Sequence, residues 1–519
     1  MIRVILTKDK MISRVLSSSV LGVDAYLVEV EVDIASGFPH FSTVGLPEGA
    51  VKESKDRVRA AIKNCGYYFP YKRITVNLAP ADRRKEGSAF DLPISLGILS
   101  ATGILNYEFI NGYVFLGELS LDGKVKSVKG VLPSSIFVRD SGLKGIIIPK
   151  ENEDEAAVVS GVKVYGVESL HEVVEFLTGH REIQPTKIDV DRVFNQSREY
   201  QVDFQEVKGQ EHVKRALEVA AAGGHNVLMI GSPGAGKTML ARRLPSILPD
   251  MSFEEALETT KIYSVLGLIP AHSSLIAMRP FRSPHHTISD AGLIGGGAIP
   301  RPGEVSLAHN GVLFLDELPE FRKNVLEVLR QPLEDGVVTI SRALTSITYP
   351  SRFMLVAAMN PCPCGYYGDP LRECTCSPLL IQKYRARVSG PLLDRIDIHI
   401  DVPPVKYREL ASEDKGETSS DIRRRVNLSR EIQKNRFERM KIHSNSQMSP
   451  RMVRKLSRPD EAGHKLLETA INKFGLSARA YDRILKVART IADLDESEQV
   501  KSHHISESIQ YRTLDRTLI

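Results

Sequence analysis

Residues 227–238 read Val227-Leu228-Met229-Ile230-Gly231-Ser232-Pro233-Gly234-Ala235-Gly236-Lys237-Thr238, and this stretch decides the fold of the region around it. Four apolar residues, a glycine-rich turn and Lys-Thr before an amphipathic run form the phosphate-binding pattern G-x-x-x-x-G-K-S/T. The glycines let the backbone aim successive N–H groups at one anion, and Lys237 adds a positive charge for the phosphates. The hydroxyl of Thr238 is a ligand for Mg²⁺. An ordinary turn is the alternative, but the strand and helix contexts both fit, so the stretch predicts a site for ATP and Mg²⁺.

The composition is that of an ordinary globular chain, with 42% apolar and 26% charged residues. Its 519 residues exceed what one hydrophobic core supports, so we expect about two to four domains. A net charge of +5 is too small to indicate nucleic-acid binding by itself. No stretch reaches the roughly 18 uncharged apolar residues of a membrane helix, and the apolar run at the start is too short for a signal peptide. We therefore expect a cytoplasmic protein that does not engage a membrane.

Two further apolar runs end in polar residues that suit nucleotide chemistry. Residues 311–317 are apolar up to Asp316 and Glu317, as in the strand beside the phosphate loop of P-loop NTPases. We expect Asp316 to hold Mg²⁺ and Glu317 to polarise the attacking water, although acids after a strand also commonly start a helix. Residues 353–359 form another predicted strand. Asn360 follows it and offers an amide to the γ-phosphate or to the attacking water.

Four of the five cysteines form a compact group, Cys362-Pro363-Cys364 and Cys374-Thr375-Cys376. Four thiolates this close in a reducing compartment indicate a structural Zn²⁺ site. The C-x-C spacing is tighter than the usual spacing of zinc ligands, so free thiols and a redox-sensitive disulfide stay open as alternatives.

The segment between the phosphate loop and Asp316 resembles a known family. Pro280-Phe281-Arg282-Ser283-Pro284-His285-His286, the triplet Gly295-Gly296-Gly297 and the run 302–311 (PGEVSLAHNG) are similar to the magnesium-chelatase type of AAA+ ATPase. The resemblance implies a core with a parallel sheet, followed by a helical lid.

The same resemblance gives two arginines a place in the chemistry. Arg395 stands where AAA+ proteins present an arginine to a neighbouring subunit, and a guanidinium there offsets charge on the transferred phosphoryl group. Pairing with Asp394 or Asp397 is the alternative, and Arg387 is a second candidate. Arg479 lies in the first turn of a helix capped by Ser477, which fits a lid arginine that reaches the nucleotide. A plain surface arginine is the alternative for Arg479.

Residues 20–175 alternate strand and helix patterns and resemble the proteolytic domain of Lon proteases, which has the ribosomal-S5-domain-2-like fold. Lon chemistry needs a serine nucleophile and a lysine base. The resemblance puts Ala89 at the nucleophile position and Leu132 at the base position; a register slip would offer Ser88 but no lysine. We therefore expect a Lon-like scaffold without peptidase activity. Its basic run Arg83-Arg84-Lys85 is either a nucleic-acid contact or a solvated loop.

Over essentially its whole length the chain is similar to the ComM/YifB family of competence-linked ATPases. That resemblance implies a homo-hexamer that binds ATP between subunits and moves DNA in its pore. The implied role is branch migration that aids integration of incoming single-stranded DNA in natural transformation and homologous recombination, with other recombination proteins as further partners. Candidate DNA contacts are His285 and His286, in the insert 283–301, and Arg342, in the predicted hairpin 336–349. An exposed strand residue is the alternative for Arg342.

We therefore expect a multidomain chain of α/β and α+β class. Its segments are a Lon-like domain at 1–180, a linker at 181–206, the AAA+ core at 207–402 and a helical lid at 403–519. Two other functions stay open. An ATPase subunit of a metal-insertion complex would share the central module, but the resemblance gives that subunit no Lon-like front. An ATP-dependent protease is disfavoured by the missing serine and lysine.

Overall fold

The computed structural model describes residues 11–190, 192, 194, 200–270, 274–297, 299–342, 345–369, 372–411, 416–440, 442–474, 476–512 and 514. The chain divides into two compact units. Unit 1 comprises residues 1–197 and 256–277, and unit 2 comprises residues 198–255 and 278–519. In the part of the chain that the structure describes, no helix is long and apolar enough to cross a membrane.

Unit 1 is built on a seven-stranded mixed sheet of order β3-β4-β2-β1-β5-β8-β9, with a short β6–β7 hairpin beside it. The elements are β1 (Met11–Leu21), β2 (Asp24–Ala35), β3 (His40–Val44), α1 (Gly49–Asn64), β4 (Arg73–Ala79), α2 (Asp91–Ala101), α3 (Tyr107–Ile110), β5 (Tyr113–Phe115), β6 (Glu118–Leu119), β7 (Val125–Lys126), α4 (Val131–Asp140), β8 (Gly145–Pro149), η1 (Lys150–Asn152), α5 (Glu153–Ala157), β9 (Val164–Val167) and α6 (Leu170–Leu177). The alternating strand and helix patterns predicted for residues 20–175 are confirmed.

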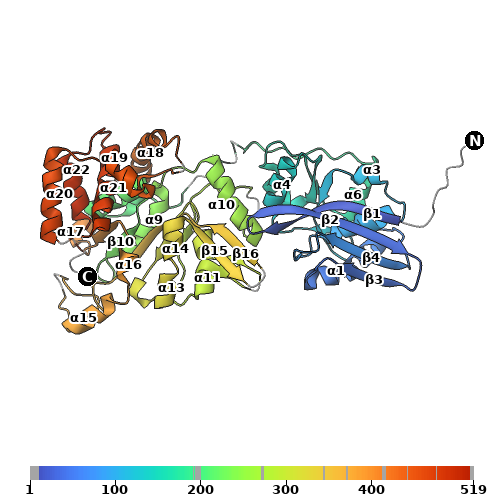
Figure 1. Cartoon of the computed structure of the whole chain (residues 1–519), viewed down its shortest axis with the longest axis horizontal. Helices are drawn as coiled ribbons and strands as arrows, with labels where there is room; N and C mark the ends of the chain where they lie inside the picture. Colours follow the sequence, from blue (N-terminus) through green and yellow to red (C-terminus); the bar gives the residue numbers. More distant parts are fainter. Residues whose placement is uncertain are drawn as a thin grey trace, which may run out of the picture. The chain divides into compact units, whose positions relative to one another are not determined.

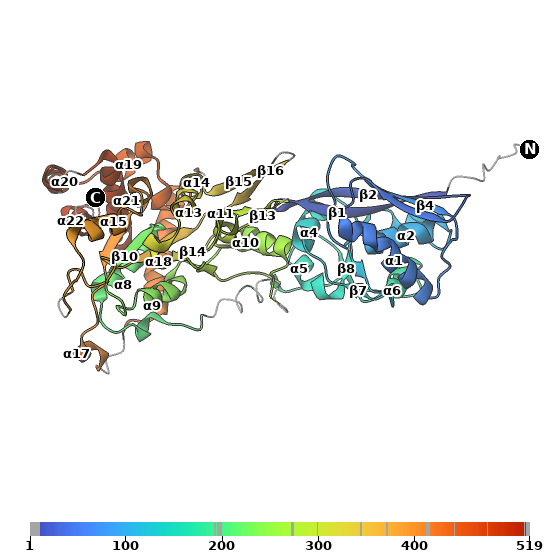
Figure 2. The same cartoon turned by 90° about the horizontal axis from the view of Figure 1, so that it is seen from below.

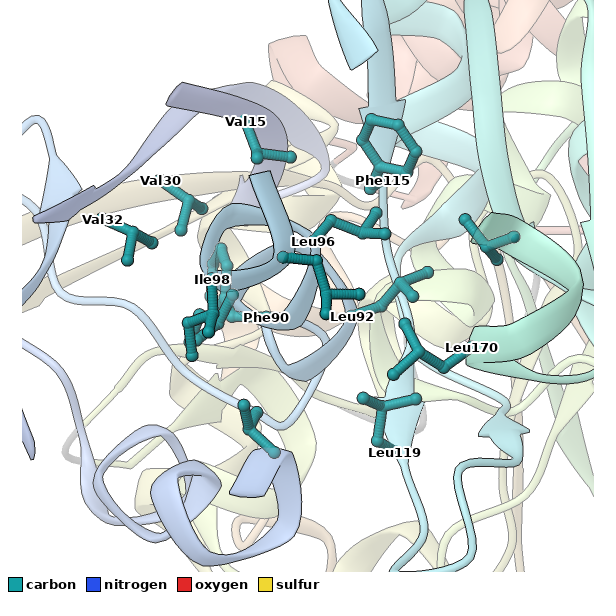
Figure 3. Packing of buried hydrophobic residues seen from close by; sticks show 14 of the residues in the cluster. Val15, Val30, Val32, Phe90, Leu92, Leu96, Ile98, Phe115, Leu119 and Leu170 are labelled. Atoms are coloured by element: carbon teal, nitrogen blue, oxygen red, sulfur yellow. The ribbon is translucent and has the colours of Figure 1, made fainter. Parts of the chain in front are cut away.

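The core of unit 1 forms around α2, which is apolar on all sides and almost entirely buried. Figure 3 shows Leu92, Leu96 and Ile98 of this helix between valines of β1 and β2 on one side and Phe115, Leu119 and Leu170 on the other. A helix that is hydrophobic all round must be enclosed on every face, and here the sheet and the surrounding loops and helices do so. Helix α2 is therefore the central element of the hydrophobic core of unit 1.

The segment 256–277 belongs to unit 1 although it lies inside the region predicted as the ATPase core, 207–402. It contains most of α10 (Phe253–Leu266). Ser264 donates a hydrogen bond to the buried carboxylate of Glu155 at 2.5 Å, and Leu257 packs on the cluster that contains Leu132. These contacts are long-range in sequence, so the periodicity of the segment could not reveal them.

Unit 2 contains a five-stranded parallel sheet of order β11-β14-β17-β10-β18. Its strands are β10 (Val227–Ile230), β11 (Phe281–Arg282), β14 (Val312–Leu315), β17 (Met354–Met359) and β18 (Ile398–Asp401), and its smaller strands are β12 (Gly295–Gly296), β13 (Arg301–Pro302), β15 (Val337–Arg342) and β16 (Thr345–Pro350). Every residue of β10, β14 and β17 is buried, as expected for a parallel sheet covered on both faces.

Helices cover this sheet and form the lid. They are η2 (Phe204–Glu206), α8 (Glu211–Gly223), α9 (Lys237–Arg243), η3 (Leu244–Ile247), α11 (Asp290–Ile294), α12 (Glu304–Leu307), η4 (Leu318–Glu320), α13 (Lys323–Glu327), α14 (Arg330–Asp335), α15 (Pro378–Arg385), α16 (Gly390–Leu393), α17 (Tyr407–Leu410), α18 (Ser419–Arg436), η5 (Asn445–Gln447), α19 (Pro450–Leu456), α20 (Glu461–Phe474), α21 (Ala478–Leu494) and α22 (Ser502–Gln510). Figures 1 and 2 show α19–α22 gathered on one side of unit 2 and the hairpin β15–β16 on the opposite side.

Candidate nucleotide site and its surroundings

The phosphate loop follows β10, which lies between β17 and β18 in the parallel sheet. Ile230 pairs with Met359 of β17, and Leu315 of β14 pairs with Ala357 of the same strand. The carboxyl ends of the three strands therefore meet at one edge. In an open parallel sheet this edge is where ligands bind.

Lys237 lies inside the loop and is 8% exposed. Its Nζ donates to the carbonyls of Gly231 at 2.6 Å and Ser232 at 3.0 Å, and to the amide oxygen of Asn360 at 3.2 Å. Burial lowers the pKa of Lys237, and the carboxylates of Asp316 and Glu317 oppose that shift. The structure thus brings together the lysine and the amide that the sequence predicted from segments 123 residues apart.

Thr238 and Asp316 also meet, because the hydroxyl of Thr238 donates to Asp316 Oδ2 at 2.7 Å. A hydroxyl and a carboxylate are oxygen donors of the kind that Mg²⁺ prefers. The loop itself leaves room for an anion. Gly234 and Gly236 have φ of +80° and +91°, and a Cβ added at Gly234 would meet nothing within 4 Å. The residues present therefore fit a Mg²⁺-bound nucleotide.

Glu317 points to solvent and has a left-handed backbone, with φ of +54°, that few non-glycine residues adopt. Its Oε2 lies 3.3 Å from Nδ1 of His286, whose ring also contacts the edge of Phe321. The sequence predicted a phosphate-contacting or hydrogen-bonding role for His286, with DNA as a candidate partner, and did not reveal this proximity. One feature of the sequence could have indicated that His286 lies near Glu317. His286 follows β11 by four residues, and β11 is the neighbour of β14, after which Glu317 comes.

Arg395 is 9% exposed and is held within its own chain. Its Nη1 donates to the Pro391 carbonyl at 2.5 Å, and its Nη2 pairs with Glu334 rather than with Asp394 or Asp397. Arg387 has a 54% exposed side chain and pairs with Glu320 at 2.9 Å. The more exposed of the two candidate arginines is therefore Arg387.

Arg479 lies in the first turn of α21, and the predicted cap is confirmed because Ser477 accepts a hydrogen bond from the N–H of Ala480. Its exposed side chain lies 3.3 Å from Asp394. One turn further along the helix, Arg483 pairs with the buried Asp397. Burial opposes ionisation of Asp397, but Arg483 together with His225 and Lys486 outweighs it and holds the pKa of that carboxyl below its usual range. The lid helix is thus ionically tied to the segment that carries Arg395.

The two segments predicted to face DNA pack against each other. Arg342 Nε donates to the Gly297 carbonyl at 3.3 Å, and the hydroxyl of Tyr349 donates to the Pro300 carbonyl at 2.6 Å. His285 contacts Thr287 at 2.9 Å and its ring lies beside that of His286. Ala298 of the insert and residues 343–344 at the turn of the hairpin lie outside the described residues.

The four cysteine sulfurs, which we call the thiol cluster, all lie within 4.8 Å of one another. The cluster occupies the loop between β17 and α15, and residues 370–371 of that loop lie outside the described part. The backbone N–H groups of Tyr366 and Thr375 lower the pKa of Cys364 to about 6. At least one member of the cluster is thus ionised near neutral pH.

A basic pocket on the lid has no counterpart among the predicted sites. Arg451, Arg454, Lys455 and Arg458 line a cavity of about 310 Å³ beside α19. None of the four forms an ion pair with another described residue. The signal in the sequence was four basic residues within eight positions, a density that is more often a solvated helix face.

In unit 1 the peptidase positions have structural roles. The side chain of Leu132 is fully buried, and Ser88 donates its hydroxyl to Glu118. The basic run is divided: Arg83 lies over the ring of Tyr26, Arg84 pairs with Glu48, and Lys85 is fully buried. Lys85 is therefore not part of a solvated basic loop.

Comparison with known families matches this geometry. Residues 203–410 match the family model described as magnesium chelatase, subunit ChlI, and residues 416–512 match its C-terminal model. Residues 30–152 match a model described as subunit ChlI of Mg-chelatase. The descriptions of the family models alone therefore do not separate unit 1 from chelatase subunits. The fold and site are those of a magnesium-chelatase-type AAA+ ATPase.

Relatives of nearly equal length are more specific. The chain is 47% identical to Competence protein ComM of Haemophilus influenzae over 97% of this chain and 98% of the relative, and 45% identical to YifB of Escherichia coli over 98% of each. It belongs to the ComM/YifB family. It is also 31% identical to Lon protease 2 of Bacillus subtilis, over 28% of this chain and 27% of that protein.

Proposed function

We propose that this protein hydrolyses ATP as a hexameric ring and uses the energy to move DNA strands during uptake-linked recombination. The observation that carries the ATPase part is the convergence of Lys237, Asn360, Thr238 and Asp316 at one sheet edge. The 47% identity to a protein named for competence supports the DNA part. The experiment is a branch-migration assay on a synthetic four-way junction with and without ATP, where an absence of ATP-dependent migration contradicts the proposal.

Each residue of the site has a role that its position permits. Lys237 would turn from the loop carbonyls to the β- and γ-phosphates, and Asn360 would hold the γ-phosphate or the water next to it. Thr238 and Asp316 would hold Mg²⁺, which supplies neutralisation of phosphate charge when bound. Glu317 is exposed at the strand end and would accept a proton from the attacking water.

We propose that the ring completes the site with an arginine from the neighbouring subunit. For Arg395 to act so, it must leave Glu334 and the Pro391 carbonyl. Arg387 must leave an exposed ion pair with Glu320 and its place over the ring of Tyr384. Mixing experiments separate these candidates from a role within one chain. Glu317→Gln subunits mixed with Arg395→Ala subunits should recover ATP turnover if Arg395 acts across the interface, and the same mixture with Arg387→Ala tests the other arginine. If neither mixture recovers activity, the shared site is wrong.

The basic pocket on α19 supports contact with a polyanion, because its four cations have no acidic partner among the described residues. Unpaired cations bind DNA phosphates without reading sequence. The double variant Arg451→Ala/Arg454→Ala should weaken DNA binding. The slope of log K against log salt concentration should become shallower by the amount that corresponds to about two lost phosphate contacts. Arg439→Ala is the matched control, since it removes an exposed lid arginine outside the pocket. Equal effects of the two changes would remove this support.

The runner-up is an ATPase subunit that remodels a metal-insertion complex, which the family models favour. DNA-stimulated ATP hydrolysis distinguishes the two, because a chelatase subunit has no need of DNA. Proteolysis is disfavoured by Ala89 and by the buried Leu132, and degradation of casein would revive it.

A further inference from the structure

The thiol cluster has the dimensions of a tetrahedral metal site. The distances between sulfurs are 3.3 Å for Cys362–Cys364, 3.7 Å for Cys362–Cys374 and 3.6 Å for Cys364–Cys374. A zinc ion with four Zn–S bonds of about 2.3 Å requires sulfurs about 3.8 Å apart. Three sulfurs are therefore near the separation that a tetrahedral site needs despite the short C-x-C spacing, and Cys376 lies within 4.8 Å of each of them.

The donor set selects the metal. Four thiolates are soft ligands that favour Zn²⁺ over Mg²⁺ or Ca²⁺. Cys362 is fully buried and the other three cysteines are partly buried. Four protein ligands would fill a tetrahedral zinc site and leave no position for a reacting group. A site of this kind stabilises a loop rather than performing chemistry.

The loop that would be stabilised contacts the phosphate loop at two points. It begins directly after Asn360, which accepts the hydrogen bond from Lys237. Gly365, between the two cysteine pairs, packs on Pro233, since a Cβ added at Gly365 would lie 2.5 Å from Pro233 Cδ. Gly365 also has φ of +88°. Both this left-handed backbone and the close approach to Pro233 therefore favour glycine at this position.

We propose that the thiol cluster binds one structural Zn²⁺, and that this ion sets the positions of Asn360 and Pro233 so that nucleotide binding depends on it. Without the ion, the two cysteine pairs are no longer joined through a common partner, and the loop loses the constraint that aligns Asn360. The metal site stands on sulfur geometry alone, whereas its effect on the nucleotide rests on the proposed function.

The test compares the double variant Cys374→Ser/Cys376→Ser with Cys65→Ser, which removes the remaining cysteine, in unit 1. Elemental analysis of the purified full chain should give about one Zn²⁺ per chain for the wild type and for Cys65→Ser, and none for the double variant. The dissociation constant of a fluorescent ATP analogue should rise about tenfold or more in the double variant only. This readout is independent of hydrolysis and of DNA.

Reconstitution of the wild-type chain with Co²⁺ tests the metal site without any variant, so the result does not depend on whether the double variant folds. Wild-type chain refilled with Co²⁺ should show the intense visible absorption of tetrahedral thiolate coordination. Metal-free wild-type protein with five freely titrating thiols overturns the proposal. If the wild type binds zinc but the folded double variant binds the ATP analogue with unchanged affinity, the proposed dependence of nucleotide binding on the ion is wrong. Wild-type protein that binds zinc and analogue but never hydrolyses ATP contradicts the proposed function instead.

Discussion

Lys85 of unit 1 and Lys237 of unit 2 are both buried, and they differ in what surrounds them. Lys85 of unit 1 is fully buried and donates to the Pro80 carbonyl. Lys237 of unit 2 is 8% exposed and donates to two loop carbonyls and to Asn360. Burial lowers the pKa of both.

Burial and a lowered pKa are common to both lysines, so they do not identify the functional one. Lys237 lies where polar side chains from three strand ends converge beside open space. Lys85 lies among backbone contacts, with its own N–H and carbonyl bonded to Leu46 and Glu48. Convergence on space that can hold a ligand separates a site from a satisfied buried cation.

The test with the largest expected effect replaces each of the two lysines in a separate variant. Lys237→Ala should abolish nucleotide binding and lower turnover by about 10³-fold or more, since a desolvated cation on the phosphates is lost. Lys85→Met should leave turnover within about twofold and change the unfolding free energy by about 1–3 kcal/mol, because Pro80 loses its donor. Analogue binding and urea unfolding measure the two effects. A loss of turnover in Lys85→Met would break the distinction.

Glu317→Gln should separate binding from chemistry within unit 2. The amide keeps the size of the side chain but cannot accept the proton, so turnover should fall about 10²–10⁴-fold while nucleotide stays bound. The contrast with Lys237→Ala is measured by nucleotide retention on gel filtration. Identical loss of binding in both variants would contradict the assigned roles.

Two buried aspartates predict opposite responses of the units to acid. Burial, only partly offset by Arg57, raises the pKa of Asp91 in unit 1 to about 6. As pH falls, Asp91 is therefore protonated in the folded unit at a higher pH than in the unfolded chain. The stability of unit 1 should therefore rise, by up to about 3 kcal/mol, as pH falls from 6 towards 4. Asp397 of unit 2 has a lowered pKa, so its contribution is present above pH ~4 and is lost as pH falls further.

Pulse proteolysis of the full chain in urea, at several pH values, reports each unit separately. Asp91→Asn should remove the rise for unit 1, and Asp397→Asn should remove the acid-induced loss for unit 2. Parallel pH profiles of the two units in the wild type would refute the assignment.

The smallest expected effect concerns His286. Its contact with the exposed carboxylate of Glu317 at 3.3 Å is worth about 1 kcal/mol or less, so His286→Ala should lower turnover about fivefold at most. His285→Ala is the matched control, because that ring contacts Thr287 instead. Weakened DNA binding with unchanged turnover would return His286 to the role of a DNA contact.

The sequence alone predicted the strand, loop and helix around Lys237, and also Asp316, Asn360 and the cap at Ser477, because local patterns carry these features. Glycine spacing, apolar runs of strand length and a capping serine act over a few residues. The family resemblance added an expected order of modules. It also added the ComM/YifB relationship, which the comparisons confirm.

Only the tertiary structure brought Thr238 to Asp316, Lys237 to Asn360, and Gly365 to Pro233. It also paired Arg395 with Glu334 and grouped residues 256–277 with unit 1. These contacts join residues far apart in the chain, and strand order and packing decide them. A local sequence pattern specifies what a segment can form, whereas the partners it meets depend on how the remaining chain closes around it.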